Sequence, residues 1–85
     1  MVRILSPRRR VFELRVNVTG YLPGTLDDWP AHIQDRIYES MENVLRQTGL
    51  KTVKIWRSYC GRDLPTEPYY VIVTLVYEPP TVVLN

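Results

Sequence analysis

The sequence predicts an α+β domain in which one helix packs on a three-stranded sheet. Three segments of nine residues have the composition of strands, and a longer segment between the first two repeats apolar residues at spacings of three and four. Glycine and proline lie between these segments, where turns are needed. The predicted order is therefore strand, helix, strand, strand.

The first strand is expected over residues 11–19, because apolar and polar side chains alternate along VFELRVNVT. The face of this strand that packs on the core would carry Phe12, Leu14, Val16 and Val18. Residues 20–24, GYLPG, combine glycine with proline and so predict a turn that ends the strand.

The helix is expected from about Trp29 to Thr48. Thr25, Asp27 or Asp28 can act as its N-terminal cap, and Gly49 follows as a C-terminal cap. The apolar stripe that would face the sheet consists of Ile33, Ile37, Met41, Val44, Leu45 and Thr48. This spacing is typical of an amphipathic helix.

Two further strands are expected over residues 51–59 and 69–77, with a loop over residues 60–68. The last strand, YYVIVTLVY, is apolar in both registers, so both of its faces need cover, as in a central strand. The side chains of the two strands expected to face the helix are Val53, Ile55, Tyr59, Val71, Val73 and Leu75.

The expected topology is a split βαβ arrangement, which is half of a ferredoxin-like fold. A connection through a helix normally makes its two strands parallel, and the last strand would then lie antiparallel between them. The three-stranded sheet is expected to be mixed, and short segments at the two ends, residues 2–5 and 81–84, could add edge strands and make it four- or five-stranded.

The bulk composition fits one small folded domain over residues 1–85. The chain is 45% hydrophobic and 24% charged, with a basic N-terminal segment at 1–10 and a tail at 79–85 that opens with two prolines. No apolar run is long enough for a membrane helix, so no membrane association and a cytoplasmic location are expected. One cysteine, Cys60, excludes an internal disulfide, and one histidine, His32, argues against a zinc site.

The positive charge is concentrated near the N-terminus. Residues 1–15 contain five arginines and one glutamate, whereas the whole chain has a net charge of only +2. Arg8, Arg9 and Arg10 could hold phosphates or acidic protein surface, although a run of arginines at a strand entrance is more often a solvated edge.

A single helix covers one face of the sheet, so the opposite face is expected to be free for contact. We expect it to carry a mixture of apolar and basic side chains around a tryptophan: Arg15, Lys54, Trp56, Tyr70, Ile72, Thr74 and Val76. Exposed apolar patches usually mark contact sites. The cover would be a second copy of the chain, the terminal segments (Val2, Ile4, Val82, Val83 and Leu84) or a partner molecule.

No residue pattern indicates catalysis, and no cofactor is expected. His32 has Asp28 and Arg36 at helical spacing and so favours surface ion pairing, and Asp27 and Asp28 are explained by capping. Cys60 has no second cysteine to resolve an oxidised form.

The sequence therefore predicts a non-catalytic protein-binding module. It would act as a regulator or inhibitor, including one encoded by a virus or mobile element, through its open sheet face or an edge strand, and a homodimer is favoured. The partner-binding residues would be Arg15, Lys54, Trp56, Tyr70, Ile72 and Val76. The alternative is a nucleic-acid-binding protein that uses Arg8, Arg9, Arg10, Arg15, Lys54 and Trp56.

Overall fold

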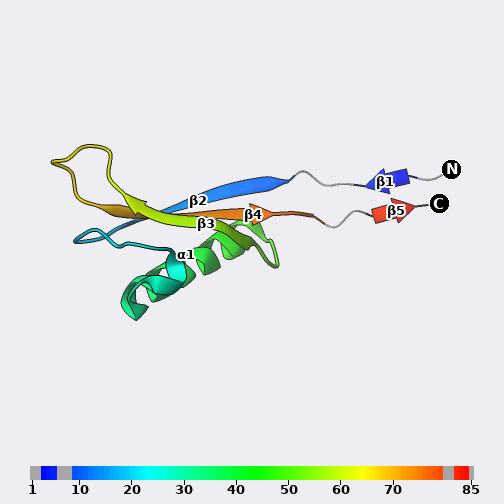
Figure 1. Cartoon of the computed structure of the whole chain (residues 1–85). Coiled ribbons are helices and arrows are strands. Elements are labelled where there is room, and N and C mark those ends of the chain that lie inside the picture. Colours follow the sequence, from blue (N-terminus) through cyan, green and yellow to red (C-terminus); the bar gives the residue numbers. More distant parts are fainter. Residues whose placement is uncertain (1–2, 6–8, 80–81, 85) are drawn as a thin grey trace.

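The computed structural model of the chain describes residues 3–5, 9–79 and 82–84. It confirms the α+β class, with one α-helix and a three-stranded sheet (Figure 1). The elements in chain order are β1 (Arg3–Leu5), β2 (Arg10–Asn17), the 3₁₀ turn η1 (Leu26–Asp28), α1 (Ala31–Thr48), β3 (Lys54–Gly61), β4 (Tyr70–Tyr77) and β5 (Val82–Leu84).

The sheet has the strand order β2-β4-β3, and both neighbouring pairs are antiparallel. It is therefore an antiparallel sheet rather than the mixed one expected. β4 is the central strand, and residues 71–76 are buried on both of its faces, which accounts for the two-sided hydrophobicity of this segment. β2 and β3 are the two edges.

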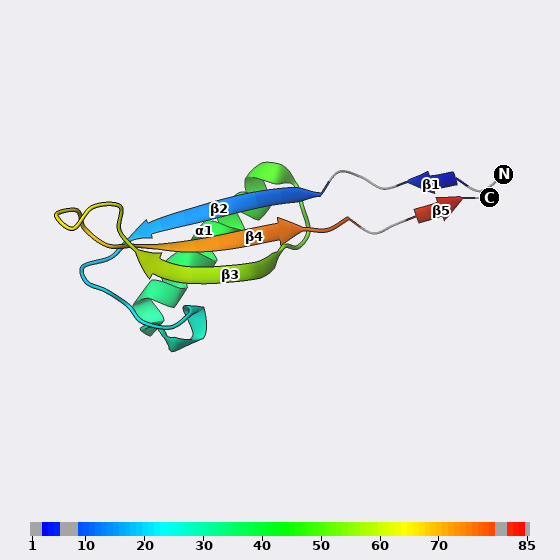
Figure 2. The same cartoon turned by 45° about the horizontal axis from the view of Figure 1, so that its top comes forward.

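β1 and β5 pair with each other instead of joining this sheet. Their antiparallel ladder joins Ile4 to Val83 and lies beyond one end of the sheet in both views (Figures 1 and 2). The expected terminal strands thus exist, but they neither extend the sheet nor cover its open face. Val2, which belonged to that expectation, lies outside the described residues.

The two ladders share one register. Arg10 pairs with Tyr77, and five positions further out on each strand Leu5 pairs with Val82. The intervening sequence includes Pro79 and Pro80, and proline has no amide proton to donate to a ladder. Pro79 therefore accounts for the end of the ladder between β2 and β4 just beyond Arg10 and Tyr77.

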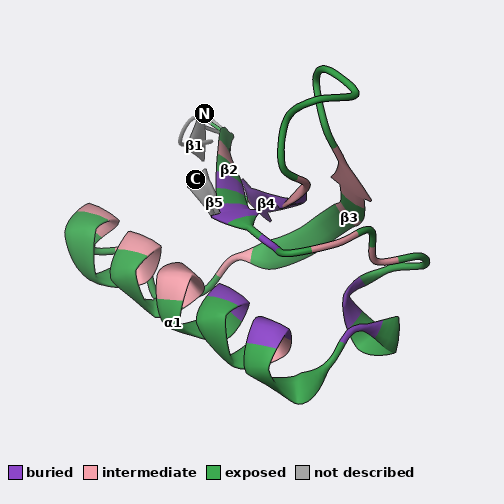
Figure 3. Ribbon diagram, turned by 90° about the vertical axis from the view of Figure 1, so that its left-hand side faces the viewer, coloured by how far each residue is buried: buried purple, intermediate pink, exposed green. Residues whose placement is uncertain are grey.

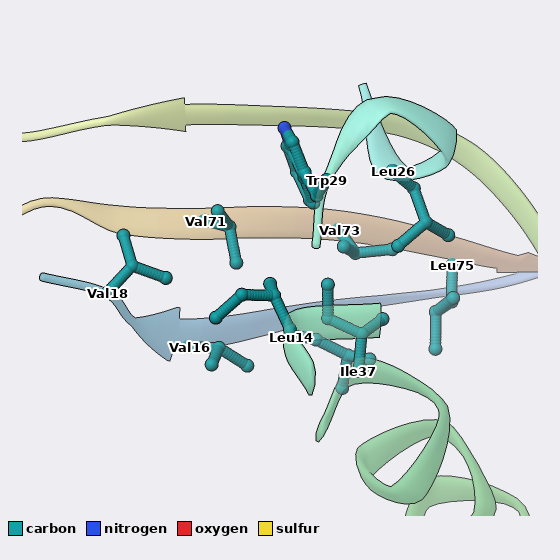
Figure 4. Packing of buried hydrophobic residues seen from close by; sticks show 10 residues of the cluster. Leu14, Val16, Val18, Leu26, Trp29, Ile37, Val71, Val73 and Leu75 are labelled. Carbon is teal, nitrogen blue, oxygen red and sulfur yellow. The ribbon is translucent and has the colours of Figure 1, made fainter. Parts of the chain in front are cut away.

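The core lies between the sheet and α1, as predicted, and Ile37, Val71, Val73 and Leu75 are fully buried (Figures 3 and 4). The remaining buried members of this cluster are Leu14, Val16, Val18, Leu26, Trp29 and Ile33. Figure 4 shows Leu26 and Trp29 among the side chains of the sheet and helix. The sequence patterns placed neither of these two residues in the core.

The start of α1 differs from the expected one. Trp29 lies between η1 and the helix, and Pro30 takes the N-cap position. The Asp28 carboxylate accepts a hydrogen bond from the Thr25 amide at 2.9 Å, so it caps η1. At the other end, Gly49 ends the helix as predicted, in the left-handed conformation (φ 73°) that glycine adopts without a Cβ clash.

A β-bulge at Trp56 reverses the faces of the second half of β3. Ile55 pairs with Leu75 and Arg57 pairs with Thr74, so Trp56 has no partner in the ladder. Beyond the bulge, Ser58 turns toward the helix side, where its hydroxyl accepts a hydrogen bond from the Leu26 amide at 2.9 Å. Strict alternation along residues 51–59 predicts that Ser58 shares the open face with Lys54 and Trp56, and this prediction is wrong for Ser58.

Tyr59 is the converse case. It pairs with Ile72 and lies on the open face, whereas strict alternation had placed it under the helix. Cys60, next along the strand, packs against the core. The single inserted residue accounts for all of these changes, because side chains alternate with a period of two.

Candidate protein-binding surface

The face of the sheet opposite α1 brings together five of the six predicted partner-binding residues. On the central strand β4, this face carries Tyr70, Ile72 and Val76. Arg15 is the partner of Ile72 from β2, and Lys54 is the partner of Val76 from β3. Directly opposite residues of an antiparallel pair point to the same side, so these five share the face.

The apolar residues at the centre of this face are already covered. Ile72 is 6% exposed and Val76 4% exposed, although α1, the α-helix of the described residues, lies on the opposite face. Ile72 lies between Arg15 and Tyr59, whose long side chains flank it from the two edge strands. Side chains of the two edge strands therefore cover the centre of the open face. Its central apolar residues are not a free contact surface.

One polar cluster closes this face beside Tyr70. The Tyr70 hydroxyl donates to the Asp63 carboxylate at 2.7 Å, and the Arg15 guanidinium donates to the same carboxylate at 3.2 Å. The Arg15 guanidinium also lies 3.8 Å from the centroid of the Tyr70 ring. The cluster ties the β3–β4 loop, which carries Asp63, to β2 and β4.

The cluster alters two pKa values. The hydrogen bond to Asp63 raises the pKa of Tyr70, because the phenol must stay protonated to donate to a carboxylate. The contact with Tyr70, followed by the charge of Asp63, raises the pKa of Arg15. The sequence did not indicate Asp63, since it lies in a loop among other turn-forming residues.

Asp63→Asn should lower the pKa of Tyr70 toward the ordinary tyrosine value of about 10. In the native chain the raised pKa contributes stability below pH of about 10, and this contribution is lost as the pH rises through the folded-state pKa. A spectrophotometric or NMR titration of Tyr70 measures the change, with Glu67→Gln in the same loop as the control. An unchanged Tyr70 titration in Asp63→Asn would show that the hydrogen bond does not control the phenol.

Arg9 and Arg10, the two arginines of the Arg8–Arg10 run that the structure describes, do not form one basic site with the open face. The Arg9 side chain lies 3.8 Å from the Glu78 carboxylate, at the register position next to the pair of Arg10 and Tyr77. The Arg10 guanidinium lies 5.0 Å from the centroid of the Phe12 ring, on the face of β2 opposite to Arg15. Arg8 lies outside the described residues.

Trp56, the sixth predicted residue, lies beside a different surface. It lines a hollow of about 350 Å³ at the edge of the sheet. One side of this hollow is β3, and the other side is formed by η1 and by Tyr38 of α1. We call this hollow the β3 groove; its lining residues are Thr25, Leu26, Asp27, Tyr38, Ile55, Trp56, Arg57 and Ser58.

Three large side chains around the β3 groove are exposed: Trp56 at 65%, Tyr38 at 45% and Ile55 at 36%. Because α1 packs most closely on β2, at the other edge of the sheet, this part of β3 has less helix cover. Ile55 was expected in the core, and that expectation was wrong. Tyr38 was missed because it lies beside the apolar stripe of α1, although an aromatic residue at an outward helical position is itself a signal.

All charged residues of the β3 strand and its flanks are basic. Residues 51–62 include Lys51, Lys54, Arg57 and Arg62, all exposed, and no acidic residue. On the outer side of β3, the described part of the chain supplies no paired strand. The β3 groove therefore adjoins a free and positively charged strand edge.

The described residues include two other side chains that could take part in chemistry, Cys60 and His32. Cys60 is half-buried, and its Sγ accepts a hydrogen bond from the Leu22 amide at 3.4 Å. His32 is exposed beside a hollow of about 200 Å³ that is lined largely by apolar residues. Among the described ranges, no three His, Cys, Asp or Glu side chains lie close enough to hold a metal ion, and α1 is too polar to cross a membrane.

Comparison with known proteins finds no matching family model, no similar curated protein and no similar solved structure.

Proposed function

We propose that the chain is a small non-catalytic protein-binding module whose contact surface is the β3 groove with the adjoining strand edge. The observation that carries this proposal is the grouping of Tyr38, Ile55 and Trp56, all exposed, around one hollow. Aromatic residues beside a recess are typical anchors of protein interfaces, where a few residues supply most of the binding energy.

The open sheet face is the weaker candidate for this contact. Its central residues Ile72 and Val76 are buried, and Arg15 and Tyr70 are engaged with Asp63. A partner that used this face would have to displace those contacts first. The β3 groove requires no such rearrangement, because its aromatic side chains are exposed in the free chain.

In this proposal the module works as a regulator or inhibitor in the cytoplasm, by occluding a surface of a larger protein. A split βαβ arrangement suits the role, and it is supported by β2 and β3 running in the same direction on either side of β4. Such an arrangement leaves β3 at an edge, where a partner has access to its backbone.

The proposal predicts that Trp56→Ala removes partner binding without unfolding the chain. A photoreactive benzophenone amino acid in place of Tyr38 should crosslink one defined protein in cells that produce the chain, and Trp56→Ala should reduce that product by about tenfold, as expected for an interface anchor. The matched control carries the photoreactive group in place of Leu64, which is 55% exposed in the β3–β4 loop, away from the β3 groove.

Circular dichroism of Trp56→Ala verifies the fold in parallel. Equal crosslinking from positions 38 and 64, or a product indifferent to Trp56→Ala, would contradict the proposal. A crosslink between two copies of the chain would instead support the homodimer expected from the sequence.

A second candidate function is binding of single-stranded nucleic acid on the open face. The observation that favours it is the arrangement of Tyr59 with the Arg57 guanidinium 4.9 Å from its ring centroid, beside Lys54 on the same strand. Rings that stack on bases next to cations that hold phosphates are the usual elements of such sites, and steep salt dependence is their signature. Trp56 does not belong to this arrangement, because the bulge leaves it without a ladder partner on the open face.

A further inference from the structure

We infer that the partner segment is an extended acidic peptide that adds to the free edge of β3 as a fourth strand. This inference rests on the proposed function and names the chemistry of the partner. An exposed edge strand offers unpaired backbone donors and acceptors, and peptide ligands commonly complete a sheet in this way.

The charge of β3 selects the partner. Lys54 and Arg57 lie on the open face of β3, and Lys51 and Arg62 flank the strand, with no acid between residues 51 and 62. Like charges placed opposite each other on neighbouring strands are destabilising, and opposite charges are stabilising. The strand that pairs with β3 therefore carries acidic side chains.

The bulge sets the spacing of those side chains. Lys54 and Arg57 pair with Val76 and Thr74, which are two residues apart on β4, so the two cations occupy successive positions on the open face. Two carboxylates that are two residues apart on an added strand, about 7 Å, would match this separation.

The residue between these two carboxylates points to the other face of the added strand. That is the side of the β3 groove, where Trp56 and Tyr38 are exposed beside Ile55. An apolar side chain at this position would bury itself against them. The recognised motif is therefore acidic, apolar, acidic in three successive residues.

The other edge of the sheet is less suited to a fourth strand. The Arg36 side chain donates to the Asn17 carbonyl at 3.0 Å and so occupies the end of β2. The hollow beside β2 is lined by polar and charged side chains of β2 and α1, and Val16 is its one apolar member among the described residues. β2 thus lacks the apolar anchor that the β3 groove provides.

Two other occupants of β3 fit less well. A second copy that paired β3 with β3 would set Lys54 and Arg57 against the same cations of its partner. A nucleic acid would satisfy the cations, but it cannot continue the backbone ladder. The acidic peptide pairs with the backbone of the edge strand, neutralises the two cations and fills the β3 groove with its apolar side chain.

Selection of peptides from a random twelve-residue display library on the immobilised full chain tests the inference. Peptides with the acidic, apolar, acidic triplet should be enriched over the input library. Enrichment without the triplet, or no enrichment, overturns the inference. In that case a crosslink from position 38 that depends on Trp56 would still uphold the proposed function, so the two failures are distinguishable.

Variants of matched net charge then locate the binding. Lys54→Gln with Arg57→Gln should weaken a selected peptide about five- to tenfold, as two cross-strand charge pairs predict. Arg9→Gln with Arg46→Gln removes the same charge from exposed positions away from β3 and should change affinity less than about twofold. Equal losses in the two double variants would overturn the assignment to β3.

Backbone N-methylation of the selected peptide tests strand addition itself. Methylation of one alternate set of amides should abolish binding, because those amides face β3, whereas methylation of the other set should be tolerated. Tolerance of both sets overturns strand addition. Displacement of the peptide by a single-stranded twelve-nucleotide DNA at low salt, lost steeply as salt rises, would assign the edge to nucleic acid instead.

Discussion

Leu75→Ala should lower the free energy of unfolding by about 2–5 kcal/mol, the range for a leucine removed from a close-packed core. Leu75 is fully buried on the central strand, between Phe12 of β2 and Ile55 of β3 in the register. Neither edge strand can move in to fill the cavity without breaking its ladder with β4. Urea denaturation followed by circular dichroism measures the loss.

The matched control for this substitution is Leu64→Ala. The same atoms are removed from a side chain that is 55% exposed in the β3–β4 loop, so the free energy of unfolding should change by less than about 0.5 kcal/mol. A chain of 85 residues has a total stability of roughly 4–13 kcal/mol at the usual value per residue, so Leu75→Ala could unfold it. Similar losses in the two variants would show that Leu75 is not a core residue.

Trp29→Ala should have the second large effect, a loss of about 3–5 kcal/mol in the free energy of unfolding. Trp29 is buried between η1 and α1, in the cluster that contains Val71 and Val73. Trp56→Ala is the control, because the same substitution is made at a side chain that is 65% exposed, and it should cost less than about 1 kcal/mol. Denaturant titrations of the two variants give the comparison directly.

Trp29→Phe separates the volume of this side chain from its polar group. The indole N–H is buried and has no hydrogen-bond partner among the described residues. An unpaired buried donor costs about 1–3 kcal/mol, so its removal offsets part of the packing lost with the smaller ring. Trp29→Phe should therefore be much milder than Trp29→Ala, and equal losses would mean that the N–H has a partner in solution.

The elements of this fold follow from local chemistry. β2 alternates cleanly because one of its faces packs on the core and the other does not, and α1 ends at Gly49 because a left-handed residue is needed there. The central place of β4 is visible in the sequence, since only a strand covered on both faces can be apolar in both registers. Five of the six predicted contact residues share one face for the same reason, the period of two.

The faces of β3 could not be predicted from its sequence. A bulge is a property of the pair of strands, and the mismatch at Trp56 exists only once Ile55 and Arg57 are fixed opposite Leu75 and Thr74. Strict alternation therefore placed Ser58 and Tyr59 on the wrong faces and assigned Trp56 to the open one. The β3 groove, which joins Trp56 to Tyr38, is accordingly invisible in the sequence.

By itself, the sequence determined the α+β class, the positions of the helix and the three long strands, and the central place of residues 69–77, because hydrophobic periodicity and turn residues act over short stretches of chain. Only the tertiary structure decided what covers the second face of that strand and which surface stays open. Side chains from β2 and β3 close over Ile72 and Val76, whereas three exposed side chains, Tyr38, Ile55 and Trp56, meet around the groove at the β3 edge. Both outcomes depend on residues far apart in the chain meeting in one register, which no local pattern specifies.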